Sequence, residues 1–135
     1  MKFFGVKIRV FRRRVVRRRR KGLKSQYIKY KDQALILAEN RIAYFNKIYD
    51  FKINKISIRN QKTRWGSCSR GGNISFNYKI ALLPEKLTDY IVVHELCHLG
   101  QFNHSKDFWN LVAQTIPNHK ELRAILNSWQ NSSIF

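Results

Sequence analysis

The chain has 135 residues, of which 44% are hydrophobic and 13% aromatic; this is enough apolar material for one domain with a buried core and excludes a largely disordered chain. Its net charge is +19, and its longest apolar stretches are interrupted by charge, which excludes a membrane span. Two cysteines without the spacing of a disulfide framework, and no signal-peptide pattern, make a cytoplasmic location the expectation.

The positive charge is concentrated at the front of the chain. Residues 1–31 contain 14 Lys/Arg and no acidic residue, whereas the other 104 residues contain 13 Lys/Arg and all 8 acidic residues. The first segment therefore carries +14 and the rest +5. Such a polycation attracts nucleic acid, nucleotides, anionic lipid or an acidic partner, although a solvated arm without a specific partner has the same composition. We expect a basic N-terminal arm over residues 1–30 and a folded domain over residues 31–135.

The N-terminal part predicts an arm followed by a helix. Apolar and other residues alternate over residues 6–10, which indicates a short strand. Gly22 interrupts the region that follows, and residues 26–30 are expected to be extended or a linker. A helix is then predicted over about residues 31–50, because apolar residues recur at steps of three and four. These residues are Leu35, Ala38, Ile42, Phe45 and Tyr49.

The middle of the chain predicts a small sheet. Ile56 and Ile58 alternate with polar residues, and a longer alternation of the same period covers residues 74–82. Between these runs, Gly66 and residues 70–73 supply turn residues. An antiparallel pair or a small sheet is therefore expected.

Three helices are predicted in the C-terminal part. Pro84 suits the start of a helix that continues to about residue 99 and ends near Gly100. Ser105 can cap a second helix, and Asn118 with Glu121 resembles the capping box of a third. The apolar residues of this last helix are Leu122, Ile125, Leu126 and Trp129. A helix, a small sheet and three further helices make an α+β fold the prediction.

The run His94-Glu95-Leu96-Cys97-His98 carries the chemistry. Histidines four residues apart project from one face of a helix, so both imidazoles can reach one zinc ion. Glu95 follows the first histidine directly, which lets its carboxylate approach a zinc-bound water rather than the metal. The non-metal alternative is a pair of satisfied helix histidines.

The third metal ligand is predicted to be His104. Gly100 ends the helix, so the chain can turn and bring His104 to the metal from another side. Three neutral histidines leave the fourth position open, as in catalytic zinc sites. Glu121 and Asp107 are the alternative third ligands. The histidine spacing also matches the metzincin proteases, but the glycine is one position early and no later methionine exists, which argues against a metzincin proper.

Several further segments are specific in combination with this motif. They are Arg64-Trp65-Gly66-Ser67-Cys68, Asn73-Ile74-Ser75-Phe76-Asn77, Leu83-Pro84, Tyr90-Ile91-Val92-Val93 before the motif, and Asn103-His104-Ser105 followed by Phe108-Trp109. With them, residues from about Tyr49 to Leu126 resemble the YgjP-like family of metal-dependent hydrolases, relatives of the SprT- and WLM-type zinc metallopeptidases.

The resemblance implies a compact zincin-like fold of the minigluzincin type. It also implies one zinc ion at His94, His98 and His104, with Glu95 as the general base. Members of the family usually have a longer β-rich region before the helix, where this chain has its arginine-rich segment. Substrate contacts made by that region are therefore not carried over.

Other polar and aromatic residues are assigned from their positions. Arg64 and Asn77 are the candidate substrate-binding residues, because polar side chains on a strand that faces the active helix can orient a substrate or polarise an oxyanion. Cys68 and Cys97 are expected to fill space in the core. His119 is expected at the surface near a helix cap.

These observations predict a zinc-dependent hydrolase in which Glu95 activates a zinc-bound water. A peptide or protein is the leading substrate, because zincin sites open beside a sheet edge that can bind an extended peptide. One alternative is a nucleoside triphosphate (pyro)phosphohydrolase that uses the same metal site; the basic arm suits it, but a phosphate-binding Gly-rich loop with a lysine is lacking. The other is a DNA-associated SprT-like protease, or a nucleic-acid-binding module with structural zinc.

Overall fold

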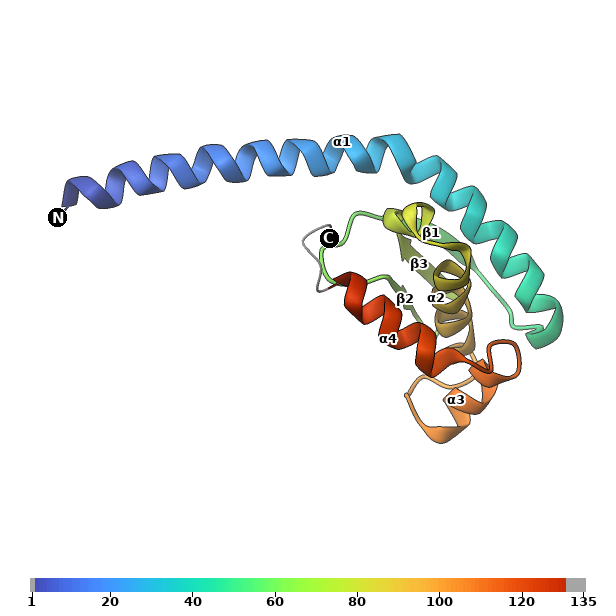
Figure 1. Cartoon of the computed structure of the whole chain (residues 1–135). Helices are drawn as coiled ribbons and strands as arrows, with labels where there is room; N and C mark the ends of the chain where they lie inside the picture. Colours follow the sequence, from blue (N-terminus) through green and yellow to red (C-terminus); the bar gives the residue numbers. More distant parts are fainter. Residues whose placement is uncertain (1, 131–135) are drawn as a thin grey trace.

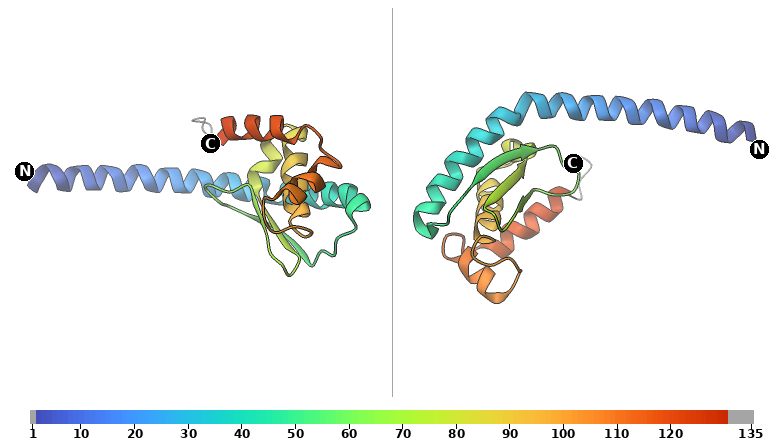
Figure 2. Two further views of the ribbon diagram at one scale, coloured as in Figure 1. Left: turned by 90° about the horizontal axis from the view of Figure 1, so that it is seen from below. Right: turned by 180° about the vertical axis from the view of Figure 1, so that it is seen from behind.

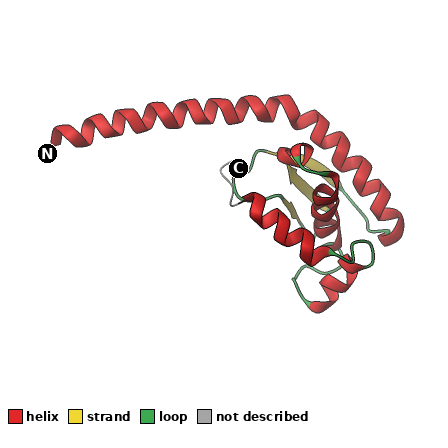
Figure 3. Cartoon of the chain, viewed as in Figure 1, coloured by secondary structure: helices red, strands yellow, loops and turns green. Residues whose placement is uncertain are grey.

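The computed structural model describes the backbone of residues 2–130 and the side chains of residues 24–130. A long helix, a small three-stranded sheet and further helices follow one another along the chain, as in the predicted α+β fold (Figures 1 and 3). The elements are α1 (Lys2–Tyr49), β1 (Lys55–Arg59), β2 (Gly66–Cys68), β3 (Asn73–Asn77), the 3₁₀-helix η1 (Tyr78–Leu82), α2 (Glu85–Cys97), α3 (Lys106–Ala113) and α4 (His119–Gln130).

Helix α1 continues through the whole arginine-rich segment. The predicted strand at residues 6–10, the interruption at Gly22 and the linker at residues 26–30 are therefore wrong. Extending an existing helix avoids the cost of nucleating a new element, which favours helix over a separate strand and linker in this segment. The first half of α1 extends away from the rest of the chain, and its last turns pack on the body (Figure 2). The division into a basic arm and a folded body stays a prediction.

The buried face of α1 is close to the predicted one. Ala34, Ala38, Ile42 and Phe45 are buried, and Leu35 is half-buried. Arg41 joins this helix to α2, because its guanidinium donates to both carboxylate oxygens of Asp89, at 2.7 and 3.0 Å. The amphipathic face of α1 thus anchors the helix that carries the histidine motif.

The three strands form a mixed sheet of order β1-β3-β2. The two predicted runs are β1 and β3, and they pair in parallel, with Ile56 opposite Ile74, so the antiparallel pair is wrong and the small-sheet alternative holds. The antiparallel partner of β3 is β2, which was expected to be part of a turn. The long predicted strand ends at Asn77, because its side-chain carbonyl accepts a hydrogen bond from the backbone N–H of Lys79 and starts η1. Strand β2 pairs only with β3 and therefore lies at one edge of the sheet.

Helix α2 is the central element. It packs against α1, β2, α3 and α4, and Figure 1 shows it enclosed by them. Most of its side chains from Leu87 to Cys97 are buried, which is typical of a helix covered on several sides. Thr88 is buried as well and donates to the backbone carbonyl of Ile80 at 2.8 Å.

Helices α3 and α4 follow as predicted, with one change of face. The Ser105 hydroxyl caps α3 by accepting from the backbone N–H of Phe108. On α4, Leu122 and Leu126 are buried, but Ile125 is 40% exposed, so it does not belong to the core face. Among the described residues, none of the helices combines the length and the apolar character that crossing a bilayer requires.

Candidate metal centre

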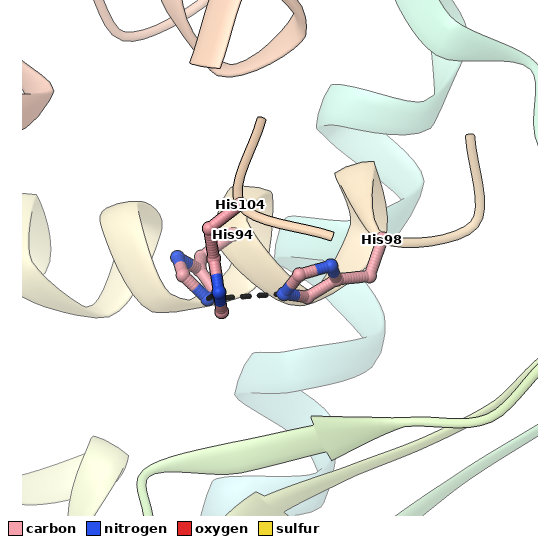
Figure 4. A group of neighbouring side chains, drawn as sticks. All are labelled: His94, His98 and His104. Atoms are coloured by element: carbon pink, nitrogen blue, oxygen red, sulfur yellow. Dashed lines mark hydrogen bonds between the residues drawn. The ribbon is translucent and has the colours of Figure 1, made fainter. Parts of the chain in front are cut away.

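Three imidazole rings meet at the end of α2. His94 and His98 come from successive turns of the helix, and His104 returns from the loop after it (Figure 4). The Nε2 atom of His94 lies 3.2 Å from Nε2 of His98 and 3.3 Å from Nε2 of His104. The sequence prediction that these three side chains converge agrees with this geometry, and their role as metal ligands remains a prediction.

The spacing of the three nitrogens fits one tetrahedral zinc ion. Two nitrogens that each lie about 2.0–2.1 Å from such an ion are about 3.3–3.4 Å apart. The separations of 3.2 and 3.3 Å around His94 are close to this value. Zinc is therefore compatible with the two separations around His94, and the ligand atoms of all three rings lie within 4.8 Å of one another.

The hydrogen bonds and protonation of the rings also suit a cation. Nδ1 of His98 donates to the backbone carbonyl of Gln101 at 3.0 Å, which leaves a lone pair on its Nε2. The buried Nδ1 of His94 has no hydrogen-bond partner within residues 24–130, so that ring makes its polar interactions at Nε2. Burial lowers the pKa of His94 to about 3, and the charges of the neighbouring histidines and of Arg123 act in the same direction. Neutral imidazoles are the form that binds metal.

Glu95 belongs to α2, faces Gly66 of β2 and lines the same cavity as the three rings. It is only 8% exposed. Burial raises the pKa of its carboxyl to about 7, and the positive charge of Arg64 opposes this effect. A Cβ atom on Gly66 would lie 2.9 Å from Cγ of Glu95 and 2.9 Å from the backbone oxygen of Ser75. Gly66 is the first residue of β2, and the turn predicted at this position is wrong. A glycine fits here because a larger residue would crowd the side chain of Glu95.

The rings and Glu95 line a cavity of about 460 Å³. One wall is the segment from Arg64 to Cys68, and the other is α4, through Arg123 and its C-terminal residues. Arg64 lies in the loop before β2 and lines the cavity, and its substrate-binding role stays a prediction. Sequence reasoning missed Arg123 and Tyr90; the three-residue step from Arg123 to Leu126 on α4 is the one signal that could have indicated Arg123.

The candidate substrate-binding role of Asn77 does not agree with its position. Its side chain is fully buried and does not line the cavity. The amide nitrogen donates to the backbone carbonyls of Gln61 at 2.7 Å and Arg64 at 3.1 Å. With its oxygen engaged by Lys79, Asn77 fixes the loop that presents Arg64.

The remaining candidates take structural positions. Among the described residues, Glu121 and Asp107 are not part of the histidine group. Cys97 is buried as expected, whereas Cys68 is half-buried in the cavity wall, where burial and the charge of Glu95 raise its pKa to about 11. His119 is partly covered, because its ring stacks on Trp109 at 5.1 Å.

Two aromatic side chains of α3 hold the rings in place. Phe108 is buried and stacks on His98, with ring centroids 4.4 Å apart and an interplanar angle of 16°. Trp109 stacks against His104 at 6.0 Å. The aromatic pair that follows Asn103-His104-Ser105 in the sequence therefore supports the candidate ligands.

The fold places the chain among the zincin-like metallopeptidase structures. A crystal structure of the metallopeptidase zymogen of Pyrococcus abyssi abylysin is similar, with a TM-score of 0.61 and 27% identity. The similarity covers 69% of this chain and 95% of that chain. The predicted fold class is thereby confirmed.

The particular family follows from the sequence match. The model of the YgjP-like metallopeptidase domain matches residues 10–129, so the chain belongs to this family, as the motifs indicated. It is also 29% identical to the UTP pyrophosphatase of Escherichia coli (strain K12) over 96 residues. This match covers 67% of the chain and 54% of the relative, so the chain spans about half the length of that protein. Both comparisons support a hydrolase.

Proposed function

We propose that the chain is a zinc-dependent hydrolase, with His94, His98 and His104 as the metal ligands and Glu95 as the general base. One observation carries the proposal: three Nε2 atoms converge within one cavity that also contains a buried carboxylate. The zinc ion supplies a Lewis acid that lowers the pKa of water and polarises the bond to be cleaved.

The protein's own residues supply the proton transfers and the positioning. Glu95 accepts a proton from the attacking water at a carboxylate oxygen and then donates it to the leaving group. Its burial between α2 and β2 keeps the carboxylate in one orientation. Arg64 and Arg123 line the same cavity, where they can stabilise negative charge that develops on the substrate.

A peptide is the proposed substrate because of the position of β2. This strand lies at the edge of the sheet, and its three residues line the cavity. An extended peptide can therefore add to β2 as a further strand, with its carbonyl group beside the three imidazoles. Membership of a metallopeptidase-domain family supports this choice.

The charge of the cavity favours a nucleotide as the second candidate substrate. Two arginines, Arg64 and Arg123, line it, whereas Glu95 is its one acidic residue. A positive cavity attracts a triphosphate. The similarity to a UTP pyrophosphatase supports this alternative.

Metal analysis and one isosteric substitution test the proposal. Purified protein should contain one zinc per chain, and His94→Ala should contain almost none. Glu95→Gln should retain zinc but lose at least about 100-fold in turnover, because a general base contributes about 10²–10⁴. The matched control is Glu121→Gln, at an exposed residue outside the histidine group.

Two substrates separate the candidates: an unstructured protein such as casein, and UTP with detection of pyrophosphate. Cleavage of casein that Glu95→Gln abolishes supports the peptidase, and pyrophosphate release that it abolishes supports the second candidate. Full activity of zinc-loaded Glu95→Gln on both substrates would reject the role of Glu95.

A further inference from the structure

A second pocket lies between α3 and α4, next to the proposed metal centre. Its volume is about 370 Å³. Lys106 at the start of α3 and Lys120 at the start of α4 line it together with Arg123, Trp109 and His119. Of these lining residues, the reaction proposed above uses only Arg123.

The three cations of this pocket have no ion-pair partner among the residues whose side chains the structure describes. Within residues 24–130, no carboxylate oxygen lies within 4.0 Å of the charged nitrogens of Lys106, Lys120 or Arg123. No acidic residue lines the pocket. The guanidinium of Arg123 contacts the ring of Trp109, at 5.4 Å from its centroid, which restrains its position without cancelling its charge. The pocket is therefore a concave surface with three charges available to an anion.

Helix α4 adds to the positive potential. It begins at His119 and has 12 residues. Its first two residues, His119 and Lys120, line the pocket. The N-terminal end of a helix carries a partial positive charge. This contribution has the same sign as the three side chains.

The pocket is connected to the proposed metal centre by two residues. Arg123 lines both cavities. The ring of Trp109 stacks on two histidine rings, with centroids 6.0 Å from His104 and 5.1 Å from His119. His104 lines the cavity of the proposed metal centre, and His119 lines the second pocket. A substrate whose reacting group lies at the three imidazoles can therefore place an anionic group in the second pocket.

We propose that the pocket between α3 and α4 is an anion-binding subsite that receives a phosphate group of the substrate. A phosphate is favoured over a carboxylate because three separate cations and a helix N-terminus suit a compact group with more than one charge and several acceptor oxygens. The assignment rests on one part of the proposed function, namely that the bond to be cleaved lies at the three histidines. It therefore favours the second candidate substrate, a nucleotide or another phosphate ester or anhydride, over the peptide.

Inorganic pyrophosphate is the probe for a binding test with the zinc-loaded chain. Isothermal titration calorimetry should show that Lys106→Gln/Lys120→Gln weakens binding about tenfold, because charge-assisted hydrogen bonds are lost. Lys86→Gln is the control, since Lys86 is the second residue of α2 as Lys120 is of α4, and it lies outside both pockets. Both lysines of the pocket are exposed, so the fold should be retained, as thermal unfolding checks.

Absence of pyrophosphate binding, or equal binding by the wild type and the double variant, would overturn the subsite. Turnover identifies the source of the anion: the double variant should raise KM about tenfold for UTP and leave KM for a neutral peptide unchanged. A raised KM for an acidic peptide but not for UTP would overturn the phosphate assignment. Pyrophosphate binding that depends on the two lysines in a protein without hydrolytic activity would reject the proposed function alone, so the two failures are distinguishable.

Discussion

Gly66→Ala tests whether position 66 must lack a side chain so that Glu95, the proposed general base, can keep its place. The added methyl group would lie 2.9 Å from Cγ of Glu95 and 2.9 Å from the backbone oxygen of Ser75. The oxygen belongs to β3 and is held by the sheet, so relief must come from a shift of Glu95 or of β2 by several tenths of an ångström. Overpacking of this kind costs about 1–3 kcal/mol, and a displacement of about 1 Å in a catalytic group costs about 100-fold.

We therefore expect kcat/KM to fall about ten- to 100-fold in Gly66→Ala, with the zinc content unchanged. Urea unfolding should show a loss of about 1–3 kcal/mol in the free energy of unfolding. Gly71→Ala is the control, because the nearest atom to its new Cβ is 3.7 Å away. Wild-type kcat/KM in zinc-loaded Gly66→Ala would show that the close approach of β2 does not position Glu95.

Three further predictions concern stability. Asn77→Ala should lower the free energy of unfolding by about 2–3 kcal/mol, because two partly buried carbonyls lose their donor; a loss below about 0.5 kcal/mol in urea unfolding would contradict this. Thr88→Val should cost about 1–2 kcal/mol through the lost bond to the carbonyl of Ile80, whereas Thr63→Val, at an exposed position, should change the free energy of unfolding by less than about 0.5 kcal/mol. Removal of metal with a chelator should lower Tm of the wild type by about 5 °C and leave Tm of His104→Ala unchanged, as differential scanning fluorimetry would measure; equal shifts would argue against ligation by His104.

The histidine group could be predicted from the sequence because its spacing is local. A step of four residues on a helix and a glycine after its last turn determine where two rings point and where the chain can return. The buried helix α2 could be predicted for the same reason, since its apolar run is continuous. The fold class followed from the order of such local patterns.

The walls of the cavity could not be predicted in the same way, because they depend on contacts between distant segments. Arg123 reaches the cavity only when α4 packs on α2, and the local pattern of α4 also misplaced Ile125. Asn77 is followed by an alternation typical of a strand, and its own capping bond overrides that pattern. The continuation of α1 through Gly22 was missed because local preferences give little indication of how far an established helix extends.

The three converging nitrogens come from residues 94–104, whereas the surfaces around them come from residues 64–68 and from α4. Reactivity and selectivity are therefore encoded in different stretches of the chain. Substitutions in the outer stretches can change which molecule is admitted while the imidazoles keep their spacing. This separation gives a physical reason why proteins similar to this chain can carry names as different as metallopeptidase and pyrophosphatase.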